Sequence, residues 1–323
     1  MKVLVTGGAG YIGSVVASQL VDAGHETVVL DDLSRGHREA VPEGARLLQG
    51  NLMEVEFARE TISEGFDGVL HFAALSLVGE SVEQPEIYYR NNVCGTLNLL
   101  EAMREAGTGR LVLSSTAAVY GEPVEIPIQE SAPTLPTNPY GSSKLAADRL
   151  IGAVCDARGL AATSLRYFNV AGASGRFGED HHPETHLIPL VLKAAAESSS
   201  VKILGTDYPT RDGTAVRDYI HVEDLGRAHL LALEAARPGE HSVYNLGNGA
   251  GFSVREVIEA ARRVTGKSID AVEAPRRAGD PAALVASSEK IQAELGWKPE
   301  KPKLETVISD AWAWMRDHPN GYG

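Results

Sequence analysis

The chain has 323 residues, of which 43% are hydrophobic and 23% are charged, so it is long enough for one large or two ordinary domains with an apolar core. The net charge of −13 argues against a nucleic-acid or anionic-membrane partner, and no run is long and apolar enough to span a bilayer. The N-terminus lacks a signal-peptide pattern, and the two cysteines, Cys94 and Cys155, are expected to be buried apolar residues in helices. A cytoplasmic protein is therefore expected.

The N-terminal stretch has the pattern of a dinucleotide-binding unit. An apolar strand over 2–6 runs into the glycine-rich turn Gly-Gly-Ala-Gly-Tyr-Ile-Gly at 7–13, and a helix follows to Ala23. A second strand over 26–30 then ends beside Asp31. In such a unit the glycines let the backbone approach a pyrophosphate and let the helix pack closely on the strand, while the helix N-terminus faces the phosphates.

Asp31 bears on the choice between the two common dinucleotides. At the end of the second strand, its carboxylate is placed to bind a ribose 2′-hydroxyl and would repel a 2′-phosphate. The sequence therefore favours NAD over NADP, although Arg35 lies close enough to keep NADP open.

Strands and helices continue to alternate as far as residue 166. Strands are expected over 47–49, 68–72, 110–114 and 161–166, and helices over 86–105 and 140–157. This alternation predicts a doubly wound, parallel α/β sheet of the Rossmann type. Ligands of such sheets bind beyond the carboxyl ends of the strands, so the segments that follow strands should converge on one crevice.

Tyr140 and Lys144 stand four residues apart in the predicted helix 140–157, and therefore on one face of it. A phenol normally titrates near ~10, and a cation beside it favours the phenolate and lowers its pKa. The pair can act as a general acid/base on a hydroxyl group, with the hydroxyl of Thr116 bonding the same oxygen. The alternatives are a surface Tyr and Lys on an ordinary helix and a Thr that caps a turn.

The second half of the chain has the character of a substrate-binding region. Ser253 and Ser287 are expected to be N-caps, and Leu225, Ala228, His229 and Ala232 share one helical face and should lie in the core. The expected helices cover 186–197, 222–234, 253–264, 287–295 and 304–317.

A Gly-rich, charged loop is expected over 172–183, and it contains Glu179, Asp180, His181 and His182 in succession. Few adjacent side chains can face one ion, and no matching run of ligands appears elsewhere. A solvated loop without a metal site is therefore expected.

Arg217 and Arg277 are the candidates for binding a diphosphate, because a guanidinium binds phosphate oxygens in a fork. The commoner use of an arginine is a surface salt bridge, and this alternative stays open from the residues alone for Arg217, in Val-Arg-Asp-Tyr-Ile-His at 216–221, and for Arg277, in Pro-Arg-Arg-Ala-Gly-Asp at 275–280.

These motifs carry a resemblance that covers essentially the whole chain. The sequence resembles the extended short-chain dehydrogenase/reductase family and, within it, the UDP-glucose 4-epimerases. The resemblance is specific because substrate-side motifs contribute as well as cofactor-side ones. The matching stretches are 3–13, 71–74, 78–82, 88–96, 114–121, 140–144, 165–170, 207–222, 244–247, 274–280 and 318–322.

The resemblance implies a role for each matching residue. Tyr140 would be the catalytic base, Lys144 its partner and Thr116 the third member. The implied substrate contacts are Thr116, Tyr140, Asn169, Leu187, Arg217, Arg277 and Asp280. The implied NAD contacts are Gly7, Gly10, Tyr11, Ile12, Gly13, Asp31, Asn51, Leu52, Phe72, Ala73, Ala74, Asn91, Ser114, Tyr140, Lys144 and Phe168.

The implied reaction interconverts UDP-galactose and UDP-glucose. The sugar is oxidised at C4 with NAD, the tethered 4-keto sugar turns, and it is reduced on the opposite face. The family's usual Lys is replaced by Ser76, which removes a cation near the cofactor phosphates. His186 replaces an Asn of the family, and Asn51 replaces an Asp near the adenine, where its amide oxygen could still accept a hydrogen bond from the adenine amino group. Leu284 occupies the position beside the sugar 2-substituent. Its intermediate size leaves activity on N-acetylhexosamines as an open question.

The remaining expectations concern rival functions, domain division and assembly. Epimerisation of another UDP-sugar, such as an N-acetylhexosamine or a uronate, is the main alternative, and a non-catalytic NAD-binding sensor is the alternative from another class. A 4,6-dehydratase is disfavoured because Ala117 and Ala118 stand where an acidic pair would be needed. We expect an NAD-binding domain over 1–168 and a UDP-sugar-binding domain over 169–323, with some later segments returning to the first domain. A homodimer is also expected, in which helices 86–105 and 140–157 would pair across the two-fold axis.

Overall fold

The computed structural model describes residues 1–277 and 280–323. Its centre is a seven-stranded sheet in the order β11-β6-β5-β4-β1-β2-β3, in which every neighbouring pair is parallel. The predicted doubly wound parallel sheet is confirmed. The strands are β1 (Lys2–Thr6), β2 (Glu26–Asp31), β3 (Ala45–Gln49), β4 (Gly68–His71), β5 (Arg110–Thr116), β6 (Ala161–Tyr167) and β11 (His241–Leu246).

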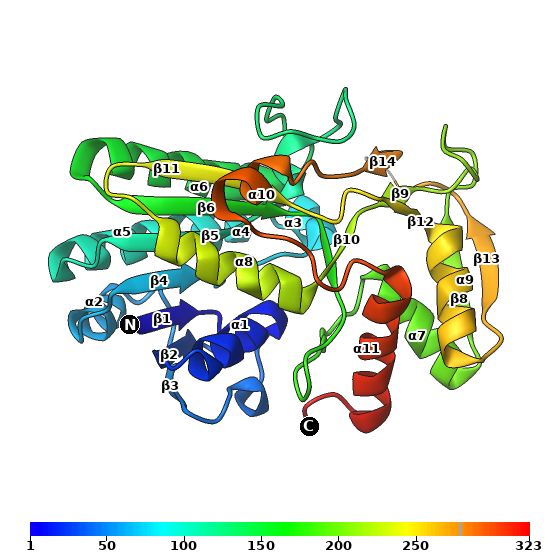
Figure 1. Cartoon of the computed structure of the whole chain (residues 1–323), viewed down its shortest axis with the longest axis horizontal. Coiled ribbons are helices and arrows are strands. Elements are labelled where there is room, and N and C mark those ends of the chain that lie inside the picture. The colour runs from blue at the N-terminus through cyan, green and yellow to red at the C-terminus, as the bar shows by residue number, and fades with distance from the viewer. Residues whose placement is uncertain (278–279) are drawn as a thin grey trace.

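Helices cover both faces of this sheet (Figure 1). One apolar core joins the sheet to α1 (Tyr11–Asp22), α8 (Val222–Ala235) and α10 (Glu289–Leu295). A second core joins its other face to α2 (Val55–Ser63), α5 (Gly95–Ala106) and α6 (Pro139–Arg158). The strand β11 and the helix α8 come from the second half of the sequence, so the chain returns to the first sheet; the boundary at 168/169 stays a prediction.

The remaining elements form a smaller region beyond the carboxyl ends of the large sheet (Figure 1). Its core lies between α7 (Leu187–Glu197), α9 (Val254–Thr265) and α11 (Leu304–Asp317). The strands pair as β7 (Asn169–Ala171) with β10 (Tyr219–His221), β8 (Ser200–Leu204) with β13 (Asp270–Ala274), and β9 (Val216–Arg217) with both β12 (Phe252–Ser253) and β14 (Ala283–Leu284).

Local sequence explains where the main helices begin and end. At α6, Pro139 occupies the first turn and Asn138 accepts the Gly141 N–H, while Gly159 ends the helix with φ +73°. Ser253 caps α9 in a capping box with Glu256, as predicted. The N-cap expected at Ser287 is wrong, because the Ser287 N–H is bonded to the Ile128 carbonyl and Ser288 precedes α10.

The helix predicted over 86–105 is also wrong as a single element. The chain instead forms α3 (Val78–Glu83), α4 (Pro85–Tyr88), a π-helical turn η2 (Tyr89–Cys94) and then α5. This turn leaves Cys94 exposed, whereas Cys155 is buried as expected. The 3₁₀ turns are η1 (Arg38–Ala40) and η3 (Ala117–Tyr120).

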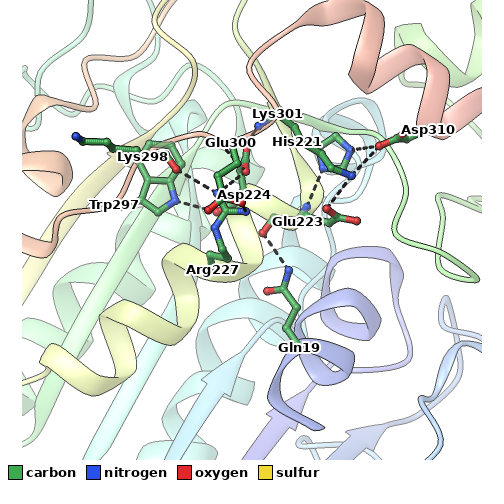
Figure 2. A network of polar contacts seen from close by, with 10 residues as sticks. All are labelled: Gln19, His221, Glu223, Asp224, Arg227, Trp297, Lys298, Glu300, Lys301 and Asp310. Atoms are coloured by element: carbon green, nitrogen blue, oxygen red, sulfur yellow. Dashed lines mark hydrogen bonds and ion pairs between the residues drawn. The ribbon is translucent and has the colours of Figure 1, made fainter. Parts of the chain in front are cut away.

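A buried carboxylate fastens the C-terminal segment to α8 (Figure 2). Asp224 is fully buried and accepts the Glu300 and Lys301 N–H groups, each at 3.0 Å, and an Arg227 guanidinium N–H at 2.6 Å. The Trp297 indole donates to the Asp224 carbonyl at 2.9 Å. Because this segment leads into α11, Asp224 joins the large sheet to the smaller region.

No helix in the part of the chain that the structure describes is long and apolar enough to cross a membrane.

Candidate active site

A cleft of about 1810 Å³ opens at the carboxyl ends of β1, β2, β4 and β5, between the large sheet and the smaller region. This is larger than the ~300–1,000 Å³ of a typical small-molecule pocket. Every residue that the sequence proposed for the site lines the cleft. The structure therefore brings the whole predicted set together, while the role of each member remains a prediction.

The glycine turn forms the floor of the cofactor side. A Cβ on Gly7, where φ is +72°, would lie 2.5 Å from the Ala73 backbone nitrogen, and one on Gly13 would lie 2.2 Å from the Gly7 carbonyl oxygen. Only glycine permits these approaches. The backbone can therefore reach a pyrophosphate at the start of α1, so these residues fit the dinucleotide that the sequence predicted.

Asp31 lies at the end of β2 and is held by two backbone donors. Its carboxylate accepts the Ala9 N–H at 3.0 Å and the Leu33 N–H at 2.9 Å. Burial raises its pKa, although these two hydrogen bonds act to lower it. Arg35 is turned to Glu80, at 3.1 Å, and to the carbonyl of His182, at 2.8 Å. Arg35 was the cation that kept NADP as an alternative, and these two contacts already engage its guanidinium.

Asn51 lines the same side, but its amide is already bonded. The amide oxygen accepts the Met53 N–H at 2.8 Å, and the amide nitrogen donates to Asp32 at 2.7 Å. Ser114, at the end of β5, is hydrogen-bonded to the Tyr167 hydroxyl. An adenine contact by Asn51 would therefore have to share the oxygen that holds Met53.

Tyr140 and Lys144 lie on one face of α6, where Lys144 is only 3% exposed. Burial raises the pKa of Tyr140, although the Thr116 side chain acts to lower it. The lowered Tyr140 pKa expected beside Lys144 is therefore not found, since burial of the phenol prevails. Burial also lowers the pKa of Lys144 to about 8, with Asp148 acting against it.

Thr116 caps a turn and also lies beside the Tyr140 phenol. It ends β5, and its Oγ1 accepts the Ala118 N–H at 3.1 Å, which caps the 3₁₀ turn η3. Its side chain also interacts with the Tyr140 phenol. The turn cap therefore fixes the hydroxyl beside the acid/base pair.

A buried polar chain behind α6 was missed by the sequence reasoning. His71 bonds Thr6 at 2.7 Å and Thr96 at 3.0 Å, and the Thr96 hydroxyl donates to the Asn92 carbonyl at 2.6 Å. Because Thr96 uses its proton there, it must accept from His71 Nε2–H, and Nδ1 accepts from Thr6. Burial and then the Lys144 charge lower the pKa of His71 to about 3, so the ring is neutral.

Asn92 completes this chain from the π-helical turn. Its amide donates to Ser143 of α6 at 3.0 Å and pairs with both backbone groups of Leu75 in the cleft wall. Asn91, which was predicted to contact the cofactor, lines the cleft one residue earlier. Two adjacent asparagines, which are poor helix formers, were the available signal for this irregular turn.

On the substrate side, Arg217 and Arg277 share one carboxylate. Arg217 donates to Asp280 and Arg277 pairs with the other oxygen of Asp280 at 3.2 Å. Arg217 is enclosed, with 12% of its side chain exposed, whereas Arg277 has 60% exposed. Leu284 pairs in register with Arg217 across β14 and β9, so it lies beside this cluster. The two residues between Arg277 and Asp280 lie outside the described residues.

The expectation of a solvated loop over 172–183 is wrong. The segment has no helix, but Glu179 has only 8% of its side chain exposed and contacts His181 at 3.2 Å and His186 at 2.7 Å. Glu184 reaches the same His186 nitrogen at 3.0 Å. The prediction considered only adjacent residues, whereas residues 184 and 186, which lie beyond the loop, supply the other half of the group.

The parallel sheet and the glycine turn define a Rossmann-type dinucleotide-binding protein, whose cleft also holds the Tyr140–Lys144 pair. The profile of the NAD dependent epimerase/dehydratase family matches residues 3–247, and the chain belongs to that family.

Similar proteins narrow this assignment. A relative from Corynebacterium glutamicum named UDP-glucose 4-epimerase is 57% identical over 316 residues, which cover 97% of this chain and 95% of the relative. A solved structure described as a UDP-glucose 4-epimerase is 48% identical, with a TM-score of 0.96 and complete coverage of both chains. The UDP-glucose 4-epimerase from Bifidobacterium longum, solved with NAD⁺ and UDP, is 37% identical, with a TM-score of 0.94 over 99% of this chain and 100% of that one. The resemblance stated from the sequence is confirmed.

Proposed function

We propose that the protein is an isomerase that interconverts UDP-galactose and UDP-glucose. The observation that carries this proposal is that Tyr140, Lys144 and Thr116 share one cleft with the glycine turn and with the Arg217–Arg277–Asp280 cluster. A dinucleotide, a reacting hydroxyl and a nucleoside diphosphate each have chemically matched residues in that cleft. Its UDP-glucose 4-epimerase relatives, including the one solved with NAD⁺ and UDP, support the same function.

NAD supplies the redox chemistry at sugar C4. The residues of the chain do the rest: Tyr140 removes and returns the proton of the 4-hydroxyl, and Thr116 orients that hydroxyl. Lys144, with a pKa of about 8, is mainly protonated at neutral pH and stabilises negative charge on the phenol. Arg217 and Arg277 bind the diphosphate. The bound diphosphate keeps the 4-keto sugar in the cleft while the sugar rotates to present its opposite face.

The range of sugars is set beside Leu284 in this proposal. Leu284 lines the cleft next to Arg217, at the position that the resemblance assigns to the sugar 2-substituent. Its intermediate size supports UDP-N-acetylhexosamines as the second candidate substrates.

A cytoplasmic homodimer belongs to the same proposal. Tyr89 of η2 and Leu97 of α5 are 43% and 40% exposed, and they place apolar surface where the predicted helix pairing would bury it. Sedimentation of the purified protein at micromolar concentration tests this part, and a monomer alone would count against it.

The test of function is a coupled assay on purified protein to which no NAD has been added. UDP-galactose is offered and UDP-glucose formation is followed, with UDP-N-acetylgalactosamine in parallel. We expect turnover of UDP-galactose, which would also show that NAD is retained. Activity only after NAD is added would point to Ser76 and loose cofactor binding.

Two outcomes separate the alternatives. No turnover of either sugar by protein that demonstrably holds NAD would refute the proposed substrates and favour another nucleotide sugar. A Tyr140→Phe variant that still restores the function in cells lacking the native protein would favour the non-catalytic sensor.

A further inference from the structure

We propose that Glu179, His181, Glu184 and His186 bind one zinc ion on the wall of the cleft. Each of these residues offers one ligand atom, and the four atoms lie within 4.8 Å of one another. This is the one such group found within residues 1–277 and 280–323. None of the four is among the residues assigned above to NAD or to the UDP-sugar, although three of them line the same cleft, so the proposal does not depend on the proposed function.

The donor set and its spacing suit zinc. Imidazole nitrogens and carboxylate oxygens bind Zn²⁺ at about 2.0–2.2 Å in tetrahedral sites, which places neighbouring ligand atoms roughly 3.4 Å apart. Three contacts within the group are already that short or shorter: Glu179 Oε1 lies 3.2 Å from His181 Nδ1 and 2.7 Å from His186 Nδ1, and Glu184 Oε1 lies 3.0 Å from His186 Nδ1. The widest separation in the group, up to 4.8 Å, would have to shorten by about 1.4 Å for the four ligand atoms to enclose an ion.

The charges balance as well. Two carboxylates and two neutral imidazoles around Zn²⁺ have no net charge, and this suits Glu179, which has only 8% of its side chain exposed. Glu179, His181 and His186 also line the cleft, so an ion can reach them from solvent.

The segment is held on both sides of the proposed ion. Before it, the Tyr11 hydroxyl donates to the Gly172 carbonyl at 2.7 Å, and the Tyr322 hydroxyl accepts the Gly178 N–H at 3.0 Å. Asp180 accepts the Tyr322 N–H at 3.0 Å. After it, His186 is the N-cap of α7. A zinc ion would cross-link this anchored loop to the start of α7, immediately before Leu187.

The competing interpretation is an ion-pair cluster without metal. The opposing charges lower the pKa of Glu179 and raise that of His186, in each case against the effect of burial, so the four residues can also be satisfied by a proton on His186. Counting bound metal distinguishes the two interpretations directly.

The experiment uses the full chain purified without a histidine tag and stripped of metal with a chelator. It is dialysed against zinc buffered at ~1 µM free ion, and bound zinc is counted by mass spectrometry. We expect about one zinc per chain in the wild type and in His182→Ala, a matched control that removes the neighbouring imidazole, which is 82% exposed and outside the group. The double variant His181→Gln, His186→Gln should retain less than a tenth of that amount.

Two further readouts keep the result unambiguous. Co²⁺ in place of zinc should give the visible absorption of a tetrahedral site in the wild type and not in the double variant, and zinc should raise the melting temperature of the wild type alone. Wild-type protein without bound zinc would overturn the proposal. Equal amounts of bound zinc in the wild type and in a folded double variant would overturn the assigned site. If the double variant does not fold, the zinc content of the single variant His181→Gln decides whether these residues bind the ion.

Discussion

The cofactor side of the cleft is built from backbone, whereas the substrate side is built from paired charged side chains. On the cofactor side, the turn 7–13 is packed so closely that a Cβ at Gly7 would clash with the main chain of residues 72–73, and a Cβ at Gly13 with that of residues 7–8. On the substrate side, Asp280 pairs with Arg277, three residues earlier in the same segment, and with Arg217, which comes from a distant strand. The first surface is preorganised by the fold, and the second is a set of ion pairs.

This difference has consequences for binding. Backbone donors at a helix N-terminus need no new partner before a phosphate arrives, so little free energy is lost in ordering them. The two guanidinium groups must instead share or exchange Asp280 when a diphosphate binds. Substitutions on the substrate side should therefore change affinity through individual side chains, while those on the cofactor side should act through the backbone.

The largest expected effect lies on neither surface but between them. Tyr140→Phe removes the hydroxyl that moves the proton while keeping the buried ring, so kcat should fall ~10³-fold. Retained binding of NAD and UDP, measured by fluorescence and calorimetry, would separate chemistry from both binding surfaces. A kcat within tenfold of the wild type would exclude Tyr140 as the acid/base.

The connection between the two regions is the next test. Asp224→Ala leaves the Glu300 and Lys301 N–H groups and the Arg227 guanidinium without their acceptor, and should lower the free energy of unfolding by ~3 kcal/mol. Denaturant unfolding measures this change. Glu300→Ala is the control, because that side chain is 72% exposed and its loss should cost less than ~0.5 kcal/mol. Equal effects of the two substitutions would mean that the Asp224 network does not join the regions.

Arg217 and Arg277 test the substrate side itself. Arg217 is nearly enclosed and pairs with Asp280, so Arg217→Ala should raise the UDP dissociation constant ~100-fold. Arg277 is mostly exposed, and its loss should cost no more than ~10-fold. Titration calorimetry with UDP gives both values, with NAD affinity as the control. The reverse order would place the diphosphate nearer to Arg277.

The pH dependence of stability tests the burial of Lys144. Its pKa of about 8 in the folded protein lies below its ordinary value of 10.5. Between these values the unfolded chain binds more protons, so the Lys144 contribution should make stability rise with pH across that window, by up to ~1.4 kcal/mol per pH unit. Below pH 8 both states are protonated, and the contribution is constant.

Other groups titrate in the same range, so the difference between the wild type and Lys144→Met isolates this contribution. Cys155, for example, has its pKa raised to about 11 by burial, which acts in the opposite direction because the folded state keeps its proton longer. Denaturant unfolding at several pH values from 7 to 10 supplies the two curves. Parallel curves would show that Lys144 titrates normally.

The same contrast explains what could be predicted from the sequence. The turn 7–13 and Asp31 are close together in the chain, and parallel strands bring their carboxyl ends to one edge, so the cofactor side followed from local patterns. Arg217, Arg277 and Asp280 were placed by resemblance, since no local period shows that β9 and β14 become neighbours. The π-helical turn that aims Asn92 at Ser143 and the grouping of Glu184 with Glu179 depend on tertiary packing, and both were missed.

Substitutions of Leu284 should have the smallest effect on activity, and they test the substrate side of the cleft at a single apolar side chain. Leu284→Ala makes room beside Arg217 without touching a charge, so the ratio of kcat/KM for UDP-N-acetylgalactosamine to that for UDP-galactose should rise by at most about tenfold. Leu284→Tyr should lower the same ratio, because a larger ring fills the space that an N-acetyl group needs. The coupled assay with both sugars measures the two ratios. If both variants change the ratio in the same direction, or neither changes it, the sugar 2-substituent does not lie against Leu284. The specificity of the substrate side is then set by another part of the cleft wall.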